Sequence, residues 1–352
     1  MFMFTREKTK QVKIGPLLLG GNDHVFIQSM ASIKTSKVLE VSEQINRCAK
    51  MGCEIMRCSC LDMEDALAFK EIKKNVSIPL VADIHFDYRL ALAALASGVD
   101  AIRLNPGNIG SEENVQKVVI ACKQRNVPIR IGVNGGSLDK SIYNGKETIK
   151  GEFLYQSALK HVRLLEKYDF HDIVISLKGS DAIETIEAYR LAASSLPYPL
   201  HLGVTEAGPM ETSLLRSAAT LSPLLLEGIG NTIRISLTED PLEEIMAASR
   251  LLHDLHLKED WPTFISCPTC GRTEVDLLPL AKKIRAYLEE NKIHKTVAIM
   301  GCIVNGPGEA KHADIGAAGG NGYWAIFKKG VVIKTVDEST VYDCLIEEIN
   351  KL

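Results

Sequence analysis

The sequence predicts an α/β protein in which a (β/α)8 TIM barrel is followed by a small α+β domain. Between residues 25 and 256, eight short apolar segments alternate with longer amphipathic segments, which is the element order of such a barrel. The alternation stops at residues 254–263, a charged stretch containing Trp261-Pro262 that is typical of a linker. We therefore expect a barrel domain at residues 1–256 and a second domain at residues 264–352.

The predicted barrel strands are apolar runs of ordinary strand length. They lie at residues 25–29, 55–58, 80–84, 101–104, 129–133, 173–177, 200–204 and 232–237. The clearest helical patterns lie at residues 36–51, 87–97, 112–125, 181–194 and 241–255. Ser111 before two glutamates and Asp240 before Pro241 are typical helix starts. A doubly wound sheet would give the same alternation, but the absence of a strand-linked Gly-x-Gly-x-x-Gly weakens its nucleotide-binding form.

The C-terminal module mixes helix and strand signals. We expect a helix at residues 275–290, a strand at 296–300, a hairpin at 323–334 that turns at Lys329-Gly330, and a closing helix that runs to residue 352. This order and size indicate a small α+β domain.

Composition excludes several classes of protein. The chain has 352 residues, 46% of them hydrophobic, and a net charge of −3, so no basic field points to nucleic acid. No apolar run approaches the roughly 20 residues that a membrane span needs. Residues 1–13 lack the apolar core of a signal peptide. Nine cysteines, an odd number without a secretion signal, indicate reduced thiols, and we expect a cytoplasmic protein.

Charged and polar side chains lie toward the C-terminal ends of the predicted strands, where barrel enzymes place their chemistry. The cations are Arg57, Arg103, Arg130, Lys178 and Arg234. Their polar neighbours are Asp83, His85, Asn105, Asn134, Ser176 and Ser236. All of these side chains are expected to face one barrel mouth.

The acids in reach, Asp83 and Glu206, are too few to neutralise five buried cations, so a ligand should supply the missing charge. A diphosphate fits both the charge and the geometry. Alternatively, individual arginines pair with carboxylates on helices or loops. The loop at residues 105–111 also offers backbone N–H groups to an anion. His85 is either an acid/base group or a hydrogen-bonded lumen residue.

Lys178 has two interpretations. Crowded by arginines, it could have a depressed pKa and form a Schiff base, as in an aldolase with a structural zinc. It could equally be a phosphate ligand, and the cysteines of the second domain favour this role.

Those cysteines are Cys267 and Cys270, which form a C-x-x-C pair, and Cys302 in a Gly/Pro-rich loop. Three thiolates suit zinc or an iron–sulfur cluster. His294 and His312 do not have a zinc-like spacing, whereas Glu309 follows an Asn-Gly-Pro-Gly turn that can fold it back as a weak fourth ligand. The remaining cysteines are interpreted as core residues: Cys48, Cys53, Cys58, Cys60, Cys122 and Cys344.

Several separated motifs resemble those of the 4-hydroxy-3-methylbut-2-enyl diphosphate synthases, iron–sulfur enzymes of the non-mevalonate isoprenoid pathway. The motifs span residues 81–89, 103–110, 129–134, 201–208, 227–230, 267–270 and 301–309. Together they cover essentially the whole chain. The short linker matches the compact two-domain form of the family, because plant-type members carry an extra domain there.

The resemblance implies a two-electron reductive ring opening of 2-C-methyl-D-erythritol 2,4-cyclodiphosphate to (E)-4-hydroxy-3-methylbut-2-enyl diphosphate. It implies a [4Fe-4S] cluster, a homodimer, and flavodoxin or ferredoxin as electron donor. The implied cluster ligands are Cys267, Cys270, Cys302 and Glu309. The implied diphosphate ligands are Arg57, Arg103, Arg130 and Lys178, with Asn105, Asn134 and Ser236 nearby.

The resemblance also makes Glu206 an active-site acid, and we take it as the candidate proton donor, with Glu309 and His85 as rivals. Because the linker is short, we expect a head-to-tail homodimer in which one subunit's cluster domain covers its partner's barrel. Two other hypotheses remain at this point: the aldolase that uses Lys178, and an iron–sulfur sensor or electron carrier, which would leave the cationic mouth unexplained.

Overall fold

The computed structural model describes residues 5–135, 151–205, 208–302 and 310–352. The chain folds into two compact units, Met1–Leu257 and Lys258–Leu352. The first contains β1 to β10 and the second β11 to β15.

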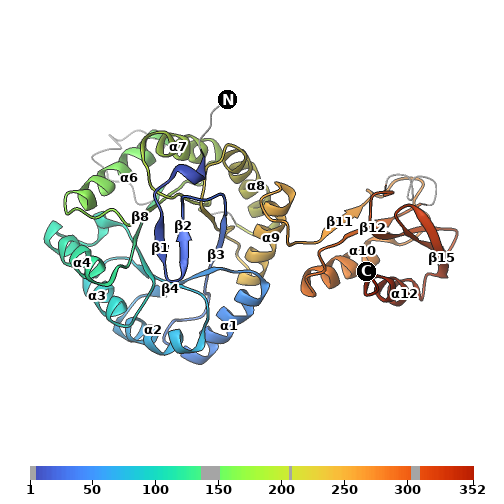
Figure 1. Cartoon of the computed structure of the whole chain (residues 1–352), viewed down its shortest axis with the longest axis horizontal. Coiled ribbons are helices and arrows are strands. Elements are labelled where there is room, and N and C mark those ends of the chain that lie inside the picture. The colour runs from blue at the N-terminus through green and yellow to red at the C-terminus, as the bar shows by residue number, and fades with distance from the viewer. Residues whose placement is uncertain (1–4, 136–150, 206–207, 303–309) are drawn as a thin grey trace. The chain divides into compact units, whose positions relative to one another are not determined.

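The first unit is built on an eight-stranded parallel sheet that curls into a barrel (Figure 1). Its strands are β3 (Phe26–Met30), β4 (Ile55–Cys60), β5 (Leu80–Ile84), β6 (Ala101–Leu104), β7 (Ile129–Asn134), β8 (Ile173–Lys178), β9 (His201–Leu202) and β10 (Thr232–Ile233). β10 pairs with β3, and a parallel bridge from Ile175 to Leu200 joins β8 to the chain just before β9. The ring is therefore nearly closed, which confirms the predicted TIM barrel over the doubly wound alternative.

Helices surround the barrel in Figure 1. They are α1 (Val38–Met51), α2 (Met63–Asn75), α3 (Tyr88–Ala96), α4 (Glu112–Arg125), α6 (Gly151–Glu166), α7 (Ala182–Ser195), α8 (Met210–Leu226) and α9 (Pro241–Asp254). Asp240 caps α9 by accepting a hydrogen bond from the Leu242 N–H, as its sequence predicts. Ser111 stands at the N-cap of α4, but its side chain makes no capping hydrogen bond.

Two barrel strands are shorter than expected. The predicted strands at 200–204 and 232–237 are reduced to the two-residue strands β9 and β10. Beyond β10, the N–H of Leu237 donates to the carboxylate of Glu244 at 3.1 Å instead of to a neighbouring strand. A side chain has thus replaced the ladder partner, and the backbone leaves the sheet.

A hairpin that the sequence did not reveal closes one end of the barrel. β1 (Val12–Ile14) and β2 (Leu17–Leu19) pair antiparallel and lie across the barrel centre in Figure 1. Their buried side chains Val12, Ile14 and Leu19 pack against residues at the start of the barrel strands, among them Ile55 and Val81. The N-terminal end of the barrel is therefore sealed by apolar contacts.

In its described residues, 258–302 and 310–352, the second unit is a five-stranded mixed sheet with two helices. Its elements are β11 (Thr263–Ser266), α10 (Leu277–Glu290), β12 (Thr296–Met300), β13 (Ile315–Gly320), β14 (Tyr323–Lys328), β15 (Val331–Asp337) and α12 (Val341–Ile349). The expected hairpin is present, since β14 and β15 pair antiparallel on either side of Lys329 and Gly330. The predicted α+β fold of this domain is confirmed.

β11 and β13 were not predicted. β13 reads Ile-Gly-Ala-Ala-Gly-Gly, which lacks the β-branched signature of a strand, yet it is buried throughout and paired on both sides. Small residues are required there, because a Cβ on Gly316 would lie 2.5 Å from the Ala298 carbonyl oxygen and 2.5 Å from the Phe327 ring. Tertiary crowding therefore overrides strand propensity in this segment.

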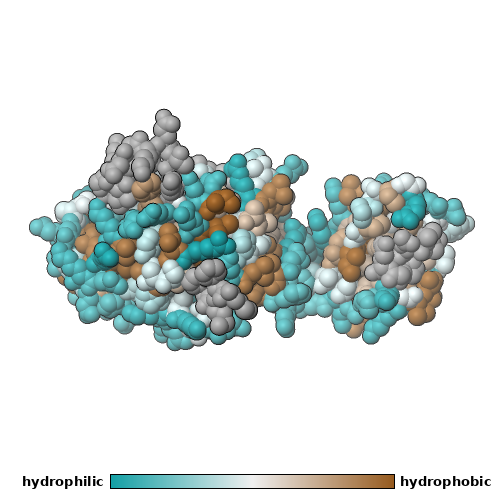
Figure 2. All heavy atoms as spheres, turned by 90° about the horizontal axis from the view of Figure 1, so that it is seen from above, coloured by the Kyte–Doolittle hydropathy of each residue, from teal (hydrophilic) through white to brown (hydrophobic). Residues whose placement is uncertain are grey.

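Hydrophilic and hydrophobic residues are mixed over the barrel helices on the face that Figure 2 shows. Among the described residues, no helix combines the length and apolarity that crossing a membrane requires.

Candidate functional site

A cavity of about 350 Å³ opens at the C-terminal ends of the barrel strands. Residues on or just after each of the eight strands line it, which is the arrangement expected of a barrel active site. The lining residues are Met30, Arg57, Asp83, His85, Arg103, Asn134, Ser176, Lys178, Val204, Thr205, Arg234 and Ser236. The fold thus brings together most of the barrel residues predicted from the sequence.

Asp83 is the centre of the charge network in this mouth. Arg103 Nη1 donates to its Oδ1 at 3.1 Å, while Arg57 Nε lies 3.5 Å and His85 Nε2 3.7 Å from its Oδ2. Burial by itself would raise the pKa of Asp83, but Arg57, His85 and Arg103 outweigh it and hold that pKa well below its usual range. Asp83 is therefore an ionised anchor for two arginines and not a proton donor at neutral pH.

Lys178 is buried among cations, and no carboxylate pairs with it among the described residues. Burial, followed by the charges of Arg57 and Arg130, lowers its pKa well below the ordinary value. Burial also lowers the pKa of Arg57 to about 10. These cations are electrostatically unfavourable together, so an anionic ligand in the mouth would stabilise them.

Two glycines make room for cations. A Cβ on Gly132 would lie 2.3 Å from Arg103 Nε, and one on Gly203 would lie 2.6 Å from Lys178 Nζ. Arg103 Nη2 also donates to the Gly132 carbonyl at 3.2 Å. Each long side chain therefore lies across a glycine, Gly132 on β7 or Gly203 just after β9, where a larger residue would displace it.

Arg234 has a partner that the sequence reasoning missed. Its Nε and Nη2 donate to the Glu244 carboxylate at 3.0 and 2.7 Å. The alternative interpretation, in which an individual arginine pairs with a helix carboxylate, therefore applies to Arg234. Glu244 lies in the first turn of α9, where acids are common because they interact favourably with the helix dipole. The sequence therefore gives no sign that this particular acid pairs with Arg234.

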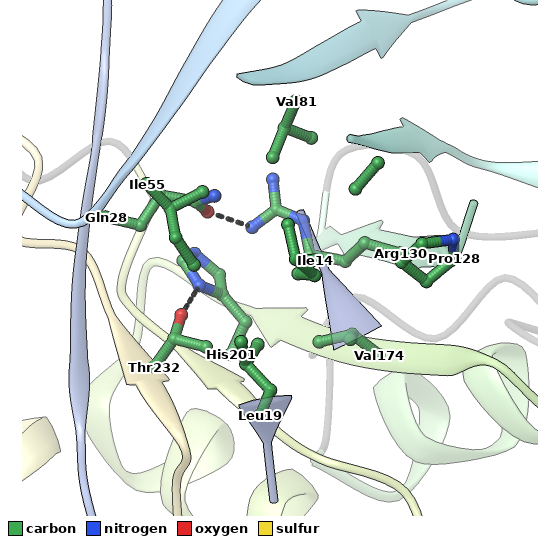
Figure 3. Close-up of a pocket in the computed structure, with 11 residues that line it drawn as sticks. Ile14, Leu19, Gln28, Ile55, Val81, Pro128, Arg130, Val174, His201 and Thr232 are labelled. Atoms are coloured by element: carbon green, nitrogen blue, oxygen red, sulfur yellow. Dashed lines mark hydrogen bonds between the residues drawn. The ribbon is translucent and has the colours of Figure 1, made fainter. Parts of the chain in front are cut away.

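Arg130 and Asn105 do not line the mouth cavity, contrary to expectation. Arg130 extends into a separate small chamber beneath it, together with His201 (Figure 3). There Arg130 Nη1 donates to Gln28 Oε1 at 3.0 Å. The Asn105 side chain accepts a hydrogen bond from the Gly107 N–H at 3.1 Å, so it shapes its own loop.

The floor of that chamber comes from the unpredicted hairpin, through Ile14 and Leu19. Arg130 and His201 are both buried, and burial lowers the pKa of each well below its ordinary value. A strand pattern places Arg130 on the lumen face but cannot tell whether a long side chain extends toward the mouth or toward the hairpin.

In the second unit, strand pairing brings the cysteine loops together. β11 runs parallel to β12, and the N–H of Gly301 donates to Cys267 Sγ at 3.1 Å. The N–H of Glu274 donates to the Gly301 carbonyl at 3.3 Å, which joins the segment after Cys270 to the residue before Cys302. The predicted ligand cysteines therefore lie on two adjacent loops at one edge of the sheet.

These thiols suit a soft metal group. Cys270 is exposed, and Cys267 and Cys302 are half-buried. The backbone N–H and side chain of Arg272 lower the pKa of the Cys270 thiol, which favours the metal-ligating thiolate. Backbone N–H groups that donate to cysteine sulfur, as at Cys267, are a feature of iron–sulfur sites.

Within the described part of the chain, no three His, Cys, Asp or Glu side chains come close enough to hold a single metal ion. Glu206 and Glu309, predicted as proton donor and fourth ligand, lie outside the described residues. The cysteines interpreted as core residues in the barrel are buried: Cys48, Cys53, Cys58, Cys60 and Cys122.

Comparison with known proteins identifies the family. Residues 9–249 match the GcpE TIM-barrel domain, and residues 263–351 match the GcpE protein C-terminal domain. The chain belongs to the GcpE family. The resemblance inferred from the motifs is confirmed, and the match includes both domains.

Relatives named 4-hydroxy-3-methylbut-2-en-1-yl diphosphate synthase (flavodoxin) align with this chain over nearly its full length. The protein of Caldanaerobacter subterraneus subsp. tengcongensis is 51% identical over 347 residues, covering 99% of this chain and 98% of the relative. That of Clostridium perfringens is 51% identical over 349 residues, with 99% of both chains covered. That of Bacillus subtilis is 50% identical over 347 residues, covering 99% of this chain and 92% of the relative.

Solved structures at low identity support the barrel fold of this GcpE-family chain. Dihydropteroate synthase from Stenotrophomonas maltophilia aligns with a TM-score of 0.54 at 12% identity, covering 70% of this chain and 97% of that chain. 3-Dehydroquinate dehydratase from Geobacillus kaustophilus aligns with a TM-score of 0.51 at 14% identity, covering 71% and 99%. At this identity the likeness concerns the fold alone.

Proposed function

We propose that this chain is a 4-hydroxy-3-methylbut-2-en-1-yl diphosphate synthase that reductively opens 2-C-methyl-D-erythritol 2,4-cyclodiphosphate in the non-mevalonate isoprenoid pathway. Relatives with 50–51% identity over nearly the whole chain carry that name. The observation that carries the proposal is the barrel mouth, which is lined by the cations Arg57, Arg103, Lys178 and Arg234. Asp83 pairs with Arg57 and Arg103, Glu244 pairs with Arg234 outside the cavity lining, and Lys178 has no carboxylate partner among the described residues. A cyclic diphosphate supplies the negative charge that this cavity lacks.

The two domains divide the work. We assign substrate binding to residues 1–256 and the redox group to residues 264–352. In the barrel, Arg57, Arg103 and Lys178 bind the diphosphate oxygens directly, and Arg234, Asn134 and Ser236 complete the mouth. We assign Arg130 and Asn105 an indirect role, without direct contact to the diphosphate, since neither lines the mouth cavity.

The redox group is an iron–sulfur cluster, which we propose to be [4Fe-4S] and held by Cys267, Cys270, Cys302 and Glu309. When bound, it supplies electrons one at a time and a Lewis-acidic iron. The soft donor set and the Gly301 N–H on Cys267 Sγ support this assignment over zinc.

The reaction balances with two electrons and one proton, because the diphosphate oxygen released by ring opening keeps its negative charge and the proton leaves with the hydroxyl as water. One bond between a ring carbon and the diphosphate breaks, a neighbouring hydroxyl leaves as water, and a carbon–carbon double bond forms. The cations of the mouth stabilise the negative charge released on the diphosphate. Glu206 is the proposed proton donor, with Glu309 and His85 as rivals.

Flavodoxin is the proposed electron donor, because the relatives' names specify it, and ferredoxin is the alternative. We propose a cytoplasmic homodimer arranged head to tail. Neither nucleic acid nor membrane is a proposed partner. The aldolase and sensor hypotheses lose their support, since the relatives are named as synthases.

Anaerobic reconstitution tests the redox half of this proposal. The reconstituted protein should bind four irons per chain, which is the count of a [4Fe-4S] cluster, and show brown thiolate-to-iron absorbance. It should also convert the cyclodiphosphate with reduced flavodoxin. Cys302→Ala should lose colour and turnover together, whereas the control Cys344→Ala should keep both. Full activity in Cys302→Ala, or a zinc-loaded colourless active protein, would refute the assignment.

The proton donor is tested separately. Glu206→Gln should lower kcat while leaving KM nearly unchanged, because the proposed loss is confined to a step after binding. An unchanged kcat would show that Glu206 is not the proton donor, and Glu309 or His85 would then be the candidate.

A further inference from the structure

Glu244 is a buried carboxylate that receives four hydrogen bonds beside the barrel mouth. Its side chain is only 3% exposed. Oε1 accepts from Arg234 Nη2 at 2.7 Å and from the Leu237 N–H at 3.1 Å. Oε2 accepts from Arg234 Nε at 3.0 Å and from the Ser29 hydroxyl at 2.7 Å. Every strong acceptor position of the carboxylate is therefore used.

These bonds fix the orientation of Arg234. The paired Nε and Nη2 contacts form a fork that permits one orientation of the guanidinium plane. The remaining nitrogen, Nη1, donates to Met30 Sδ at 3.6 Å, and both residues line the cavity. Ser29 on β3 steadies the carboxylate from the neighbouring strand, since β3 and β10 are paired.

The same carboxylate also fixes the peptide after Ser236. The Ser213 hydroxyl donates to the Ser236 carbonyl at 2.6 Å, and the N–H of the next residue, Leu237, donates to Glu244. This peptide is thus held on both sides, from α8 and from α9. Two mouth residues, Arg234 and Ser236, consequently depend on one side chain that does not itself line the cavity.

We propose that Glu244 is a positioning residue, which presents Arg234 and Ser236 to the diphosphate group of the substrate. The identity of the ligand as a diphosphate rests on the proposed function, whereas the hydrogen-bond geometry around Glu244 does not depend on it. The negative charge of Glu244 by itself disfavours this role, because a carboxylate behind Arg234 weakens the attraction of the mouth for an anion. A favourable contribution of Glu244 must therefore come from orienting Arg234. Removing the charge of Glu244 should lower the Kd for an anion, whereas losing the orientation of Arg234 should raise it.

Binding of inorganic pyrophosphate, measured by calorimetry in magnesium-free buffer, separates them. Glu244→Gln keeps the size of the side chain but removes the charge and the fork. If positioning dominates, the Kd for pyrophosphate should rise roughly tenfold, the size expected when a charge-assisted pair is lost. An unchanged or lower Kd would overturn the proposal, since removing a negative charge alone should tighten anion binding. Glu243→Gln, which removes the adjacent charge on α9, is the matched control and should leave Kd within about twofold.

A double-mutant cycle tests whether Glu244 acts through Arg234. In an Arg234→Met background, Glu244→Gln should change Kd by no more than about twofold, because the residue to be positioned is gone. A full tenfold effect in that background would show that Glu244 acts by another route. If Glu244→Gln does not fold, as judged by thermal unfolding, Ser29→Ala serves instead. It removes one donor, keeps the Arg234 fork, and should raise Kd by about threefold; no rise would contradict the proposal.

These measurements also separate this inference from the proposed function. Wild-type protein that binds pyrophosphate and shows the predicted cycle, but does not convert the cyclodiphosphate, would refute the function and keep the positioning role. Failure of the wild type to bind pyrophosphate would refute both. In an active enzyme, Glu244→Gln should raise KM and leave kcat within about threefold, as expected for lost ground-state binding.

Discussion

Lys178 shows how a single residue in the barrel mouth depends on its neighbours. It is buried, lies near Arg57, Arg103, Arg130 and Arg234, and has a pKa well below its ordinary value. At pH values above that lowered pKa the lysine is neutral, so it contributes a charge to binding only when a proton is supplied. An incoming diphosphate reverses the sign of the local field and raises the pKa of Lys178.

Pyrophosphate binding should therefore be accompanied by proton uptake at pH values between the depressed pKa of Lys178 and its ordinary value. Calorimetry in two buffers of different ionisation enthalpy measures this uptake as a difference in observed heat. Lys178→Met should remove the uptake and weaken binding by tenfold or more, as roughly expected for the loss of a charge-assisted hydrogen bond. His201→Gln, which replaces another buried base, is the control that should retain uptake. Equal heats in both buffers for the wild type would contradict this interpretation.

Asp83 presents the opposite case, an acid stabilised by cations. Because its folded-state pKa is lowered, the ionised carboxylate stabilises the fold above the ordinary aspartate pKa, and this stabilisation is lost as pH falls through the folded value. Asp83→Asn should lower the free energy of unfolding by about 3–5 kcal/mol at neutral pH, since Arg57 and Arg103 lose their shared counter-charge.

Urea unfolding with and without pyrophosphate checks this expectation. Pyrophosphate should restore part of the lost stability, because it replaces the missing negative charge beside the same arginines. Glu71→Gln, which breaks an exposed pair with Lys74 on α2, should cost less than about 1 kcal/mol and gain nothing from pyrophosphate. A loss of similar size in both variants would remove Asp83 from the centre of the network.

Among the elements, the β1–β2 hairpin has the clearest mechanical role. Leu19 is fully buried against the strand starts, whereas its neighbour Leu18 is 47% exposed. The hairpin closes the barrel from the N-terminal end and forms the floor of the Arg130 chamber. This element therefore separates a buried cation from water.

Leu19→Ala should destabilise the barrel by about 2–5 kcal/mol, the cost of a buried large-to-small change. Leu18→Ala changes the same residue type one position away and should cost less than about 1 kcal/mol. Chemical denaturation of the two variants measures the difference. Equal effects would mean that the hairpin does not seal the barrel.

At the scale of the whole molecule, the cations proposed to bind substrate and the cysteines proposed to hold the cluster lie in different units of the chain. A head-to-tail homodimer would bring the barrel of one subunit to the cluster domain of the other. Mixing a barrel-dead Arg57→Met protein with a cluster-dead Cys302→Ala protein should then restore up to about a quarter of wild-type activity, from statistical exchange of subunits. The double mutant Arg57→Met/Cys302→Ala, mixed with wild type, is the control. Recovery of no activity after verified subunit exchange would refute the head-to-tail arrangement.

The sequence predicted those features that depend on local pattern. Alternating apolar and amphipathic segments specify a barrel because parallel strands and their helices must each bury one side. Arg57, Asp83, Arg103, Lys178 and Arg234 could be placed at the mouth because side chains alternate along a strand and polar ones were near its C-terminal end. The C-x-x-C pair and the Cys302 loop were recognisable because thiolate ligands come in short spacings.

The strands β13, β1 and β2 were not predicted, because residue propensity and local sequence pattern in these segments do not indicate a strand. β13 is rich in glycine, and its strand conformation is imposed by partners on both sides. The hairpin strands β1 and β2 are only three residues each, too short for a periodic signal.

By itself, the sequence determined the fold class, the family and the collection of cations and cysteines, since each is indicated by short local patterns along the chain. Only the tertiary structure decided how the cations are used: Arg234 is paired with Glu244, Arg130 extends toward Gln28, and Lys178 has no carboxylate partner in the described mouth. These outcomes depend on contacts between distant segments, such as β3 with β7. A charged side chain takes the partner that lies within hydrogen-bond distance in the folded protein, and sequence spacing does not specify that distance.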